Sequence, residues 1–123
     1  MIRLALLLSL AALPAQAFTA QNDMRVLPTG NAAFSVPWSG NSAPTAFWCA
    51  AGDYVIRGLG QPPATKVYRT SPLPRRSGEP MQFALSAAAS VGSTGLALFG
   101  SDDGGVSAAF AQNFCNRMDG WDD

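Results

Sequence analysis

The chain has 123 residues, and its eight basic and eight acidic side chains give a net charge of zero. This balance gives no general attraction to nucleic acid or to an anionic membrane, so we expect no nucleic-acid partner. The chain contains no histidine, which excludes Ser-His-Asp and Cys-His catalysis and any metal site built on imidazole. It also lacks a Gly-x-Gly-x-x-Gly motif and a phosphate loop, and we predict no catalytic residue, no cofactor and no metal.

Residues 1–17 have the pattern of a secretory signal peptide. Arg3 provides a basic start, residues 4–13 form an apolar run, and Ala15-Gln16-Ala17 has the small residues of a cleavage site. A membrane anchor is the alternative, but the run is about ten residues, whereas a span needs roughly 20. We therefore expect a Sec-type signal cleaved after Ala17 and a single periplasmic or secreted domain of residues 18–123, with no membrane span after cleavage.

Two short segments near the start of that domain predict a β-hairpin. Residues 24–29 read as a strand that Pro28 either confines to the edge of a sheet or ends. Gly30-Asn31 is a turn signal, and residues 33–37 alternate apolar and polar as the partner strand.

Residues 42–60 have the boundaries and the periodicity of a helix. Ser42 is a suitable N-cap, Pro44 suits the first turn, and Gly60 can take the left-handed conformation that ends a helix. At about 100° per residue, the apolar residues occupy an arc of roughly 140° that should face a core. They are Phe47, Trp48, Ala51, Tyr54, Val55 and Leu59.

The other sides of this helix predict two further contacts. Asp53 and Arg57 lie opposite the apolar arc at i, i+4, with the acid first, which is the favourable order. Cys49 and Ile56 lie together at one flank, where we expect a second element to pack.

The rest of the chain predicts three strands and a second helix. The strands are expected at residues 65–70, 81–86 and 95–99. A helix over about 107–117 would begin at Ser107 and bury Phe110, Phe114 and Cys115. The expected fold is α+β, a small antiparallel sheet of about four to five strands with two helices on one face. We expect the acidic C-terminal tail to fray.

Cys49 and Cys115 are the only cysteines, and in an exported chain we expect them to form a structural disulfide. The bond would close a loop of roughly 66 residues and contribute about 4 kcal/mol in the chain-entropy model. Two free thiols or a redox-active pair are the alternatives. The redox pair is disfavoured because there is no Cys-x-x-Cys motif and no histidine to activate a thiolate.

Three residues are candidates for an interaction surface. Arg75 and Arg76 lie in the proline-rich loop of residues 71–80, which could present them to an anionic partner. Their other interpretation is a solvated loop whose charges prevent aggregation. Trp38 follows the first hairpin in a loop of small residues, either as an exposed anchor or packed against Phe34.

The acidic side chains give only weak evidence for a metal site or a catalytic site. Asp102 and Asp103 adjoin Gly104-Gly105, but the loop lacks the alternating acids and terminal Glu of a calcium loop. Two carboxyls about 5–10 Å apart could hydrolyse a glycosidic bond, and Asp53 or Glu79 could supply the second. The simpler interpretation is a solvated turn before a helix.

Residues 47–54 (FWCAAGDY), 57–60 (RGLG) and 114–115 (FC) form a pattern across most of the mature chain. Through it the chain resembles a set of small exported proteins of Gram-negative bacteria that carry no assigned function. The resemblance implies a periplasmic protein with paired cysteines, and it brings no catalytic residue, ligand or partner.

These observations favour a non-enzymatic binding or interaction module in the periplasm. Its partner would be a periplasmic protein or an anionic component of the envelope. Two alternatives stay open: a small hydrolase that uses Asp53 with Asp102 or Asp103, and a purely structural envelope protein.

Overall fold

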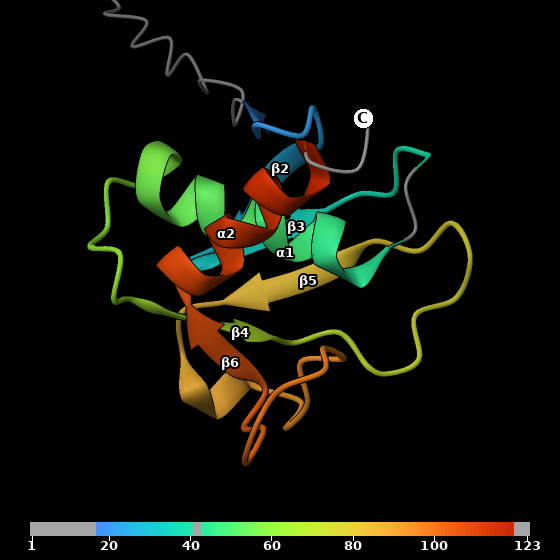
Figure 1. Ribbon diagram of the computed structural model, residues 1–123, viewed down its shortest axis with the longest axis vertical. Helices are drawn as coiled ribbons and strands as arrows, with labels where there is room; N and C mark the ends of the chain where they lie inside the picture. Colours follow the sequence, from blue (N-terminus) through green and yellow to red (C-terminus); the bar gives the residue numbers. More distant parts are fainter. Residues whose placement is uncertain (1–16, 41–42, 120–123) are drawn as a thin grey trace, which may run out of the picture.

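The computed structural model describes residues 17–40 and 43–119, with side chains as far as Asn116 (Figure 1). Residues 1–16 of the predicted signal, Ser42 and residues 120–123 of the predicted tail therefore lie outside the described residues. The predicted α+β class is confirmed: an antiparallel sheet in the order β1-β2-β3-β5-β4-β6 accompanies two helices, so the sheet has six strands rather than four or five. The bounds are β1 (Phe18–Thr19), β2 (Arg25–Gly30), β3 (Ala33–Val36), α1 (Pro44–Asp53), β4 (Lys66–Arg69), β5 (Met81–Ala84), β6 (Gly105–Ser107) and α2 (Ala108–Asp119).

The first hairpin forms as predicted, with Leu27 opposite Ser35 and Pro28 opposite Phe34. β1 pairs only with the first residues of β2, Arg25 and Val26, so Pro28 lies beyond its reach at a free edge. A proline without an N–H group is tolerated there because no neighbouring strand requires the donor.

The predicted strand at residues 95–99 is wrong. Gly95 and Gly100 have positive φ angles of 77° and 86°, which turn the chain at both ends of the segment, and Phe99 is fully exposed. The last position in the sheet is instead taken by β6, whose Val106 pairs with Val67 of β4. The segment still packs Leu96 and Leu98 against the core, but as an irregular loop that turns at its glycines.

α1 is enclosed on all sides, and every residue from 46 to 53 is buried. Its aromatic side packs on the sheet as predicted: the Trp48 ring meets Phe83 edge-on at 4.8 Å, and Phe34 and Phe83 stack at 5.6 Å. Tyr54, just beyond α1, meets Phe34 at 4.8 Å. This aromatic layer fixes α1 over the middle of the sheet, where β3 and β5 are neighbours.

α2 covers the other side of α1, and Figure 1 shows the two helices crossing over the same part of the sheet. The predicted disulfide is confirmed between Cys49 and Cys115, with Cα atoms 4.9 Å apart. Asp53 lies away from the aromatic layer, as predicted, but it is fully buried because α2 covers it. Its carboxylate accepts hydrogen bonds from Gln21, from Gln112 of α2 and from Arg57.

The helix boundaries are close to the predicted ones, with two corrections to the predicted core. α1 continues as a π-helical turn, η1 (Tyr54–Gly58), and Gly60 takes the predicted left-handed conformation with φ of 67°. Leu59 is 39% exposed because the chain has left the helix there. Ser107 caps α2 by accepting from the Phe110 amide, but Phe110 is 43% exposed because α2 turns it toward solvent.

Gly52 is where the two helices approach most closely, since a β-carbon there would lie 2.6 Å from the carbonyl oxygen of Ala108 and 2.6 Å from the amide nitrogen of Gln112. Neither atom can move without shifting the α2 backbone. We therefore expect Gly52→Ala to lower the free energy of unfolding by about 1–3 kcal/mol, as overpacking does in cores. Urea denaturation measures this change.

Gly30→Ala is the matched control for this substitution. A β-carbon at Gly30 would meet only the Ala33 side chain, at the ordinary contact distance of 3.9 Å. Its effect should stay within about 0.5 kcal/mol. Equal effects of the two substitutions would contradict close packing at Gly52.

Candidate functional site

Three of the five basic residues between positions 57 and 76 are used within the fold. Arg57 forms an ion pair with Asp53 at 2.7 Å, and Lys66 pairs with Asp103 at 2.8 Å. In each pair the two opposite charges compensate each other. The third, Arg69, is only 1% exposed.

Arg69 is a buried cation held by backbone carbonyl groups. Its Nε donates to the carbonyl of Ser71 at 3.0 Å and its Nη2 to that of Pro72 at 3.1 Å. Nη1 lies 3.5 Å from the carbonyl oxygen of Thr94, which also accepts from the Trp48 indole at 3.1 Å. Burial lowers the pKa of Arg69, and the nearby charge of Arg75 lowers it further.

The role of Arg69 is absent from the sequence predictions, although the sequence contains a signal for it. Val67 and Arg69 are two residues apart on β4, so their side chains share a face of the sheet. Because Val67 is apolar and inward, Arg69 must also face the core. Arg69 therefore holds the start of the loop of residues 71–80 from the core side, through its hydrogen bonds to the carbonyls of Ser71 and Pro72.

The far half of that loop is shaped by a turn. The amide of Glu79 donates to the carbonyl of Arg76 at 3.1 Å, and the Arg76 amide donates to the Glu79 carboxylate at 3.2 Å. Gly78 has a φ of 83°, the positive value that the third residue of a type II turn requires. The turn holds Arg76 and Glu79 side by side.

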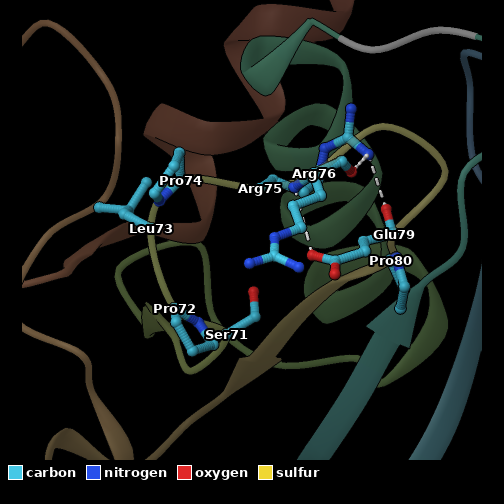
Figure 2. A pocket seen from close by; sticks show the side chains of 8 residues that line it. All are labelled: Ser71, Pro72, Leu73, Pro74, Arg75, Arg76, Glu79 and Pro80. Atoms are coloured by element: carbon cyan, nitrogen blue, oxygen red, sulfur yellow. Dashed lines mark hydrogen bonds between the residues drawn. The ribbon is translucent and has the colours of Figure 1, made fainter.

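A pocket of about 390 Å³ lies within this loop, and we call it the Arg76 pocket (Figure 2). Figure 2 shows the Arg76 guanidinium pointing into the pocket, toward the Ser71 hydroxyl and beside the Glu79 carboxylate. Apart from Arg75, the other lining residues are Leu73 and three prolines. The lining residues are Ser71, Pro72, Leu73, Pro74, Arg75, Arg76, Glu79 and Pro80.

Arg75 and Arg76 have different roles, although they are adjacent in sequence. The Arg75 guanidinium lies 4.7 Å from the centroid of the Phe47 ring and donates to the carbonyls of Arg76 and Glu79, at 3.0 and 2.8 Å. It therefore covers the core and closes the loop. The Arg76 guanidinium forms no hydrogen bond or ion pair with any residue that the structure describes, so its donors face the pocket unused.

Trp38 lies at the same end of the sheet as the Arg76 pocket. β3 ends at Val36 opposite Met81, where β5 begins, so Trp38 follows β3 on the side from which the loop enters β5. Trp38 is 45% exposed, so part of its surface is accessible to solvent.

Of the four candidate catalytic carboxylates, Glu79 lies exposed beside Arg76, and the other three are held by internal partners. Asp53 is fully buried with the partners described above, and Asp103 accepts from Lys66 and from the Gly105 amide. Asp102 accepts from the amide and hydroxyl of Thr94 and from the Gly104 amide. Burial raises the pKa of the Asp102 carboxyl, but these hydrogen bonds outweigh it and hold the pKa below its ordinary value. The hydrogen bonds of Asp102 and Asp103 therefore stabilise the loop that precedes β6.

Within the described residues, no group of three or more Asp, Glu, Cys or His side chains has the arrangement of a metal site. No helix in the same part of the chain is long and apolar enough to cross a membrane. Comparison with protein-family models, curated proteins and solved structures finds no match for this chain.

The hydrogen bonds to Asp102 predict an acid-dependent loss of stability. A carboxyl whose pKa is lowered by folding stabilises the fold above its unfolded pKa of about 3.9, and this stability is lost as pH falls through the folded pKa. We expect Asp102→Asn to reduce the decline in unfolding free energy between about pH 5 and pH 2. Urea denaturation across this pH range measures the decline.

Asp23→Asn is the control, because Asp23 is exposed and its side chain accepts no hydrogen bond from the described residues. Asn also tolerates the positive φ of 66° at this position. If the unfolding free energy of Asp102→Asn falls on acidification as much as that of Asp23→Asn, the prediction is wrong.

Proposed function

We propose that the protein is an exported, non-enzymatic binding domain that uses the Arg76 pocket to hold an anionic group of a partner in the bacterial envelope. The observation that carries this proposal is that the two adjacent arginines have different surroundings. Arg75 is engaged by Phe47 and two carbonyls, whereas the Arg76 guanidinium faces the pocket without a partner among the described residues.

The chemistry of the pocket favours a single carboxylate. A guanidinium binds a carboxylate through two parallel hydrogen bonds, and the Ser71 hydroxyl beside it can donate a third. Glu79 places one negative charge at the same site, which disfavours a ligand with several negative charges. Leu73 and the prolines offer apolar contact next to the ion pair. An acidic side chain or a chain terminus of a periplasmic protein therefore fits better than an anionic polymer of the envelope.

Export is supported by two features that point the same way. Residues 1–17 have the basic, apolar and small-residue regions of a cleavable signal. The Cys49–Cys115 disulfide is typical of proteins that fold in an oxidising compartment such as the periplasm. The resemblance to small exported proteins of Gram-negative bacteria agrees with this proposal.

The hydrolase alternative receives less support from the geometry. A general acid or base must reach substrate and water, but Asp53 is fully buried. Asp102 and Asp103 accept hydrogen bonds from loop amides, the Thr94 hydroxyl and Lys66, so their carboxylates are already occupied. A purely structural role would leave the exposed guanidinium of Arg76 to solvent, and it predicts no preference of the pocket for a carboxylate.

Export predicts a defined N-terminus. When the full chain is expressed in a Gram-negative host, we expect the protein in the periplasmic extract to begin at Phe18 and to lack two hydrogens because of the disulfide. Intact mass spectrometry with and without reductant measures both properties. Recovery of the chain in the cytoplasm with residues 1–17 still attached would contradict export.

The binding proposal predicts that Arg76, and not Arg75, determines affinity for a carboxylate. The probe is a short peptide whose only carboxylate is its free C-terminus, and NMR titration of the backbone amides follows its binding. We expect shifts in residues 71–80, and a loss of affinity of at least about tenfold in Arg76→Gln, because a charge-assisted pair contributes roughly 1.5–3 kcal/mol.

Arg25→Gln is the matched control, since Arg25 is an exposed arginine on β2, outside the residues that line the pocket. Its substitution removes the same charge and should leave the affinity unchanged. Equal weakening by both substitutions would reveal a general effect of net charge and overturn the assigned pocket.

A further inference from the structure

The Arg76 pocket presents a cation and an anion next to each other. The guanidinium of Arg76 lies beside the carboxylate of Glu79, and both side chains are exposed. Of the two carboxylate oxygens, Oε2 accepts from the Arg76 amide at 3.2 Å, and Oε1 accepts no hydrogen bond from any residue that the structure describes. The pocket therefore offers a donor for an anion and, beside it, an acceptor for an N–H group of the same ligand.

The Ser71 hydroxyl has a proton left to donate. Its oxygen accepts a hydrogen bond from the backbone amide of Gln82 on β5, at 3.0 Å. A hydroxyl has one proton, and this one is donated to no acceptor among the described residues. Figure 2 shows the hydroxyl facing the Arg76 guanidinium, so both groups can donate to one carboxylate.

The apolar part of the pocket is rigid and held against the rest of the fold. Leu73 is 43% exposed, and a β-carbon at Gly95 would lie 3.0 Å from its Cδ2 atom. One side of the leucine is therefore packed, while the other remains available to a ligand. Pro72, Pro74 and Pro80 line the same pocket. Because proline rings lose almost no side-chain freedom on contact, binding an apolar group against them costs little entropy.

We propose, building on the carboxylate site described above, that the Arg76 pocket binds the last residue of a polypeptide and prefers an apolar side chain there. Arg76 and Ser71 hold the terminal carboxylate, and Glu79 accepts the N–H group of the same residue. Leu73 and the prolines contact its side chain. The volume of about 390 Å³ lies near the lower end of the roughly 300–1,000 Å³ of ligand pockets, which suits one residue rather than a longer segment.

The pairing of Arg76 with Glu79 favours a chain terminus over other anions. In a terminal residue the carboxylate and the amide nitrogen are attached to the same carbon atom, so two adjacent groups of the pocket can hold both. In an aspartate or glutamate within a chain, the carboxylate lies farther from its own amide nitrogen. A phosphate group has no N–H donor, and its higher negative charge is repelled more strongly by Glu79.

The test is an NMR titration of the backbone amides with short acetylated peptides that differ only in their last residue. We expect the peptide ending in leucine to bind at least about fivefold more tightly than the one ending in alanine, because each buried CH₂ group contributes about fourfold. Replacing the terminal carboxylate by an amide should weaken binding about tenfold or more. Methylating the last peptide nitrogen, which removes the donor to Glu79, should also weaken it about tenfold.

Leu73→Ala tests the apolar part of the pocket. This variant should bind the leucine and alanine peptides with nearly equal affinity and remain sensitive to amidation. Unchanged amide signals outside residues 71–80 verify that it folds. Leu59→Ala is the matched control, since Leu59 is a similarly exposed leucine outside the pocket, and it should keep the preference for the leucine peptide.

The outcomes separate this proposal from the carboxylate site on which it rests. Equal affinity for the leucine and alanine peptides, with amidation still weakening both, would overturn the apolar preference and leave the carboxylate site in place. Equal binding of the free and amidated peptides would overturn the carboxylate site itself. Unchanged affinity after methylation would remove Glu79 from recognition, and with it the preference for a terminal residue. Tighter binding of free leucine would assign the pocket to an amino acid instead of a polypeptide.

Discussion

The contact between α1 and α2 at Gly52 is the constraint on which the rest of the fold depends. The two helices meet at a point where backbone touches backbone, so the helix that lies against the sheet is covered on its other side as well. This closeness brings Cys49 and Cys115 within bonding distance and lets Gln112 reach Asp53. A larger residue at position 52 would separate the helices and weaken all of these contacts together.

Arg69 holds the surface loops together, as the contact at Gly52 holds the two helices together. It links the carbonyls of Ser71 and Pro72, at the start of one loop, to Thr94 in another. Burying a cation is costly, and here carbonyl dipoles rather than a carboxylate offset the cost. No carboxylate among the described residues pairs with Arg69. The loops are therefore held by contacts between carbonyl groups and a guanidinium, whose charge does not change over the physiological pH range.

The periodic parts of the fold were predictable from the sequence, because helix and strand patterns report which side faces the core. The central helix and the first hairpin followed from such patterns, whereas the disulfide followed from the presence of just two cysteines in a chain expected to be exported. The failures arose because local apolarity reports neither the backbone conformation nor where a neighbouring element lies. Residues 95–99 read as a strand although the chain turns at Gly95 and Gly100, and Leu59 and Phe110 read as core although both are exposed. The site was predictable only as a loop with two arginines. Distinguishing Arg75 from Arg76 required the position of Phe47, a contact across 28 residues of sequence.

The complete enclosure of α1 has a consequence for the newly made chain. One side of this helix packs on β5, and the other side packs on α2, which ends at Asp119. A polypeptide synthesised from its N-terminus therefore cannot close its core until α2 has emerged. Until then Cys49 is an unpaired thiol and its aromatic neighbours remain uncovered, so the machinery that handles the nascent chain receives an open polymer rather than a folded domain.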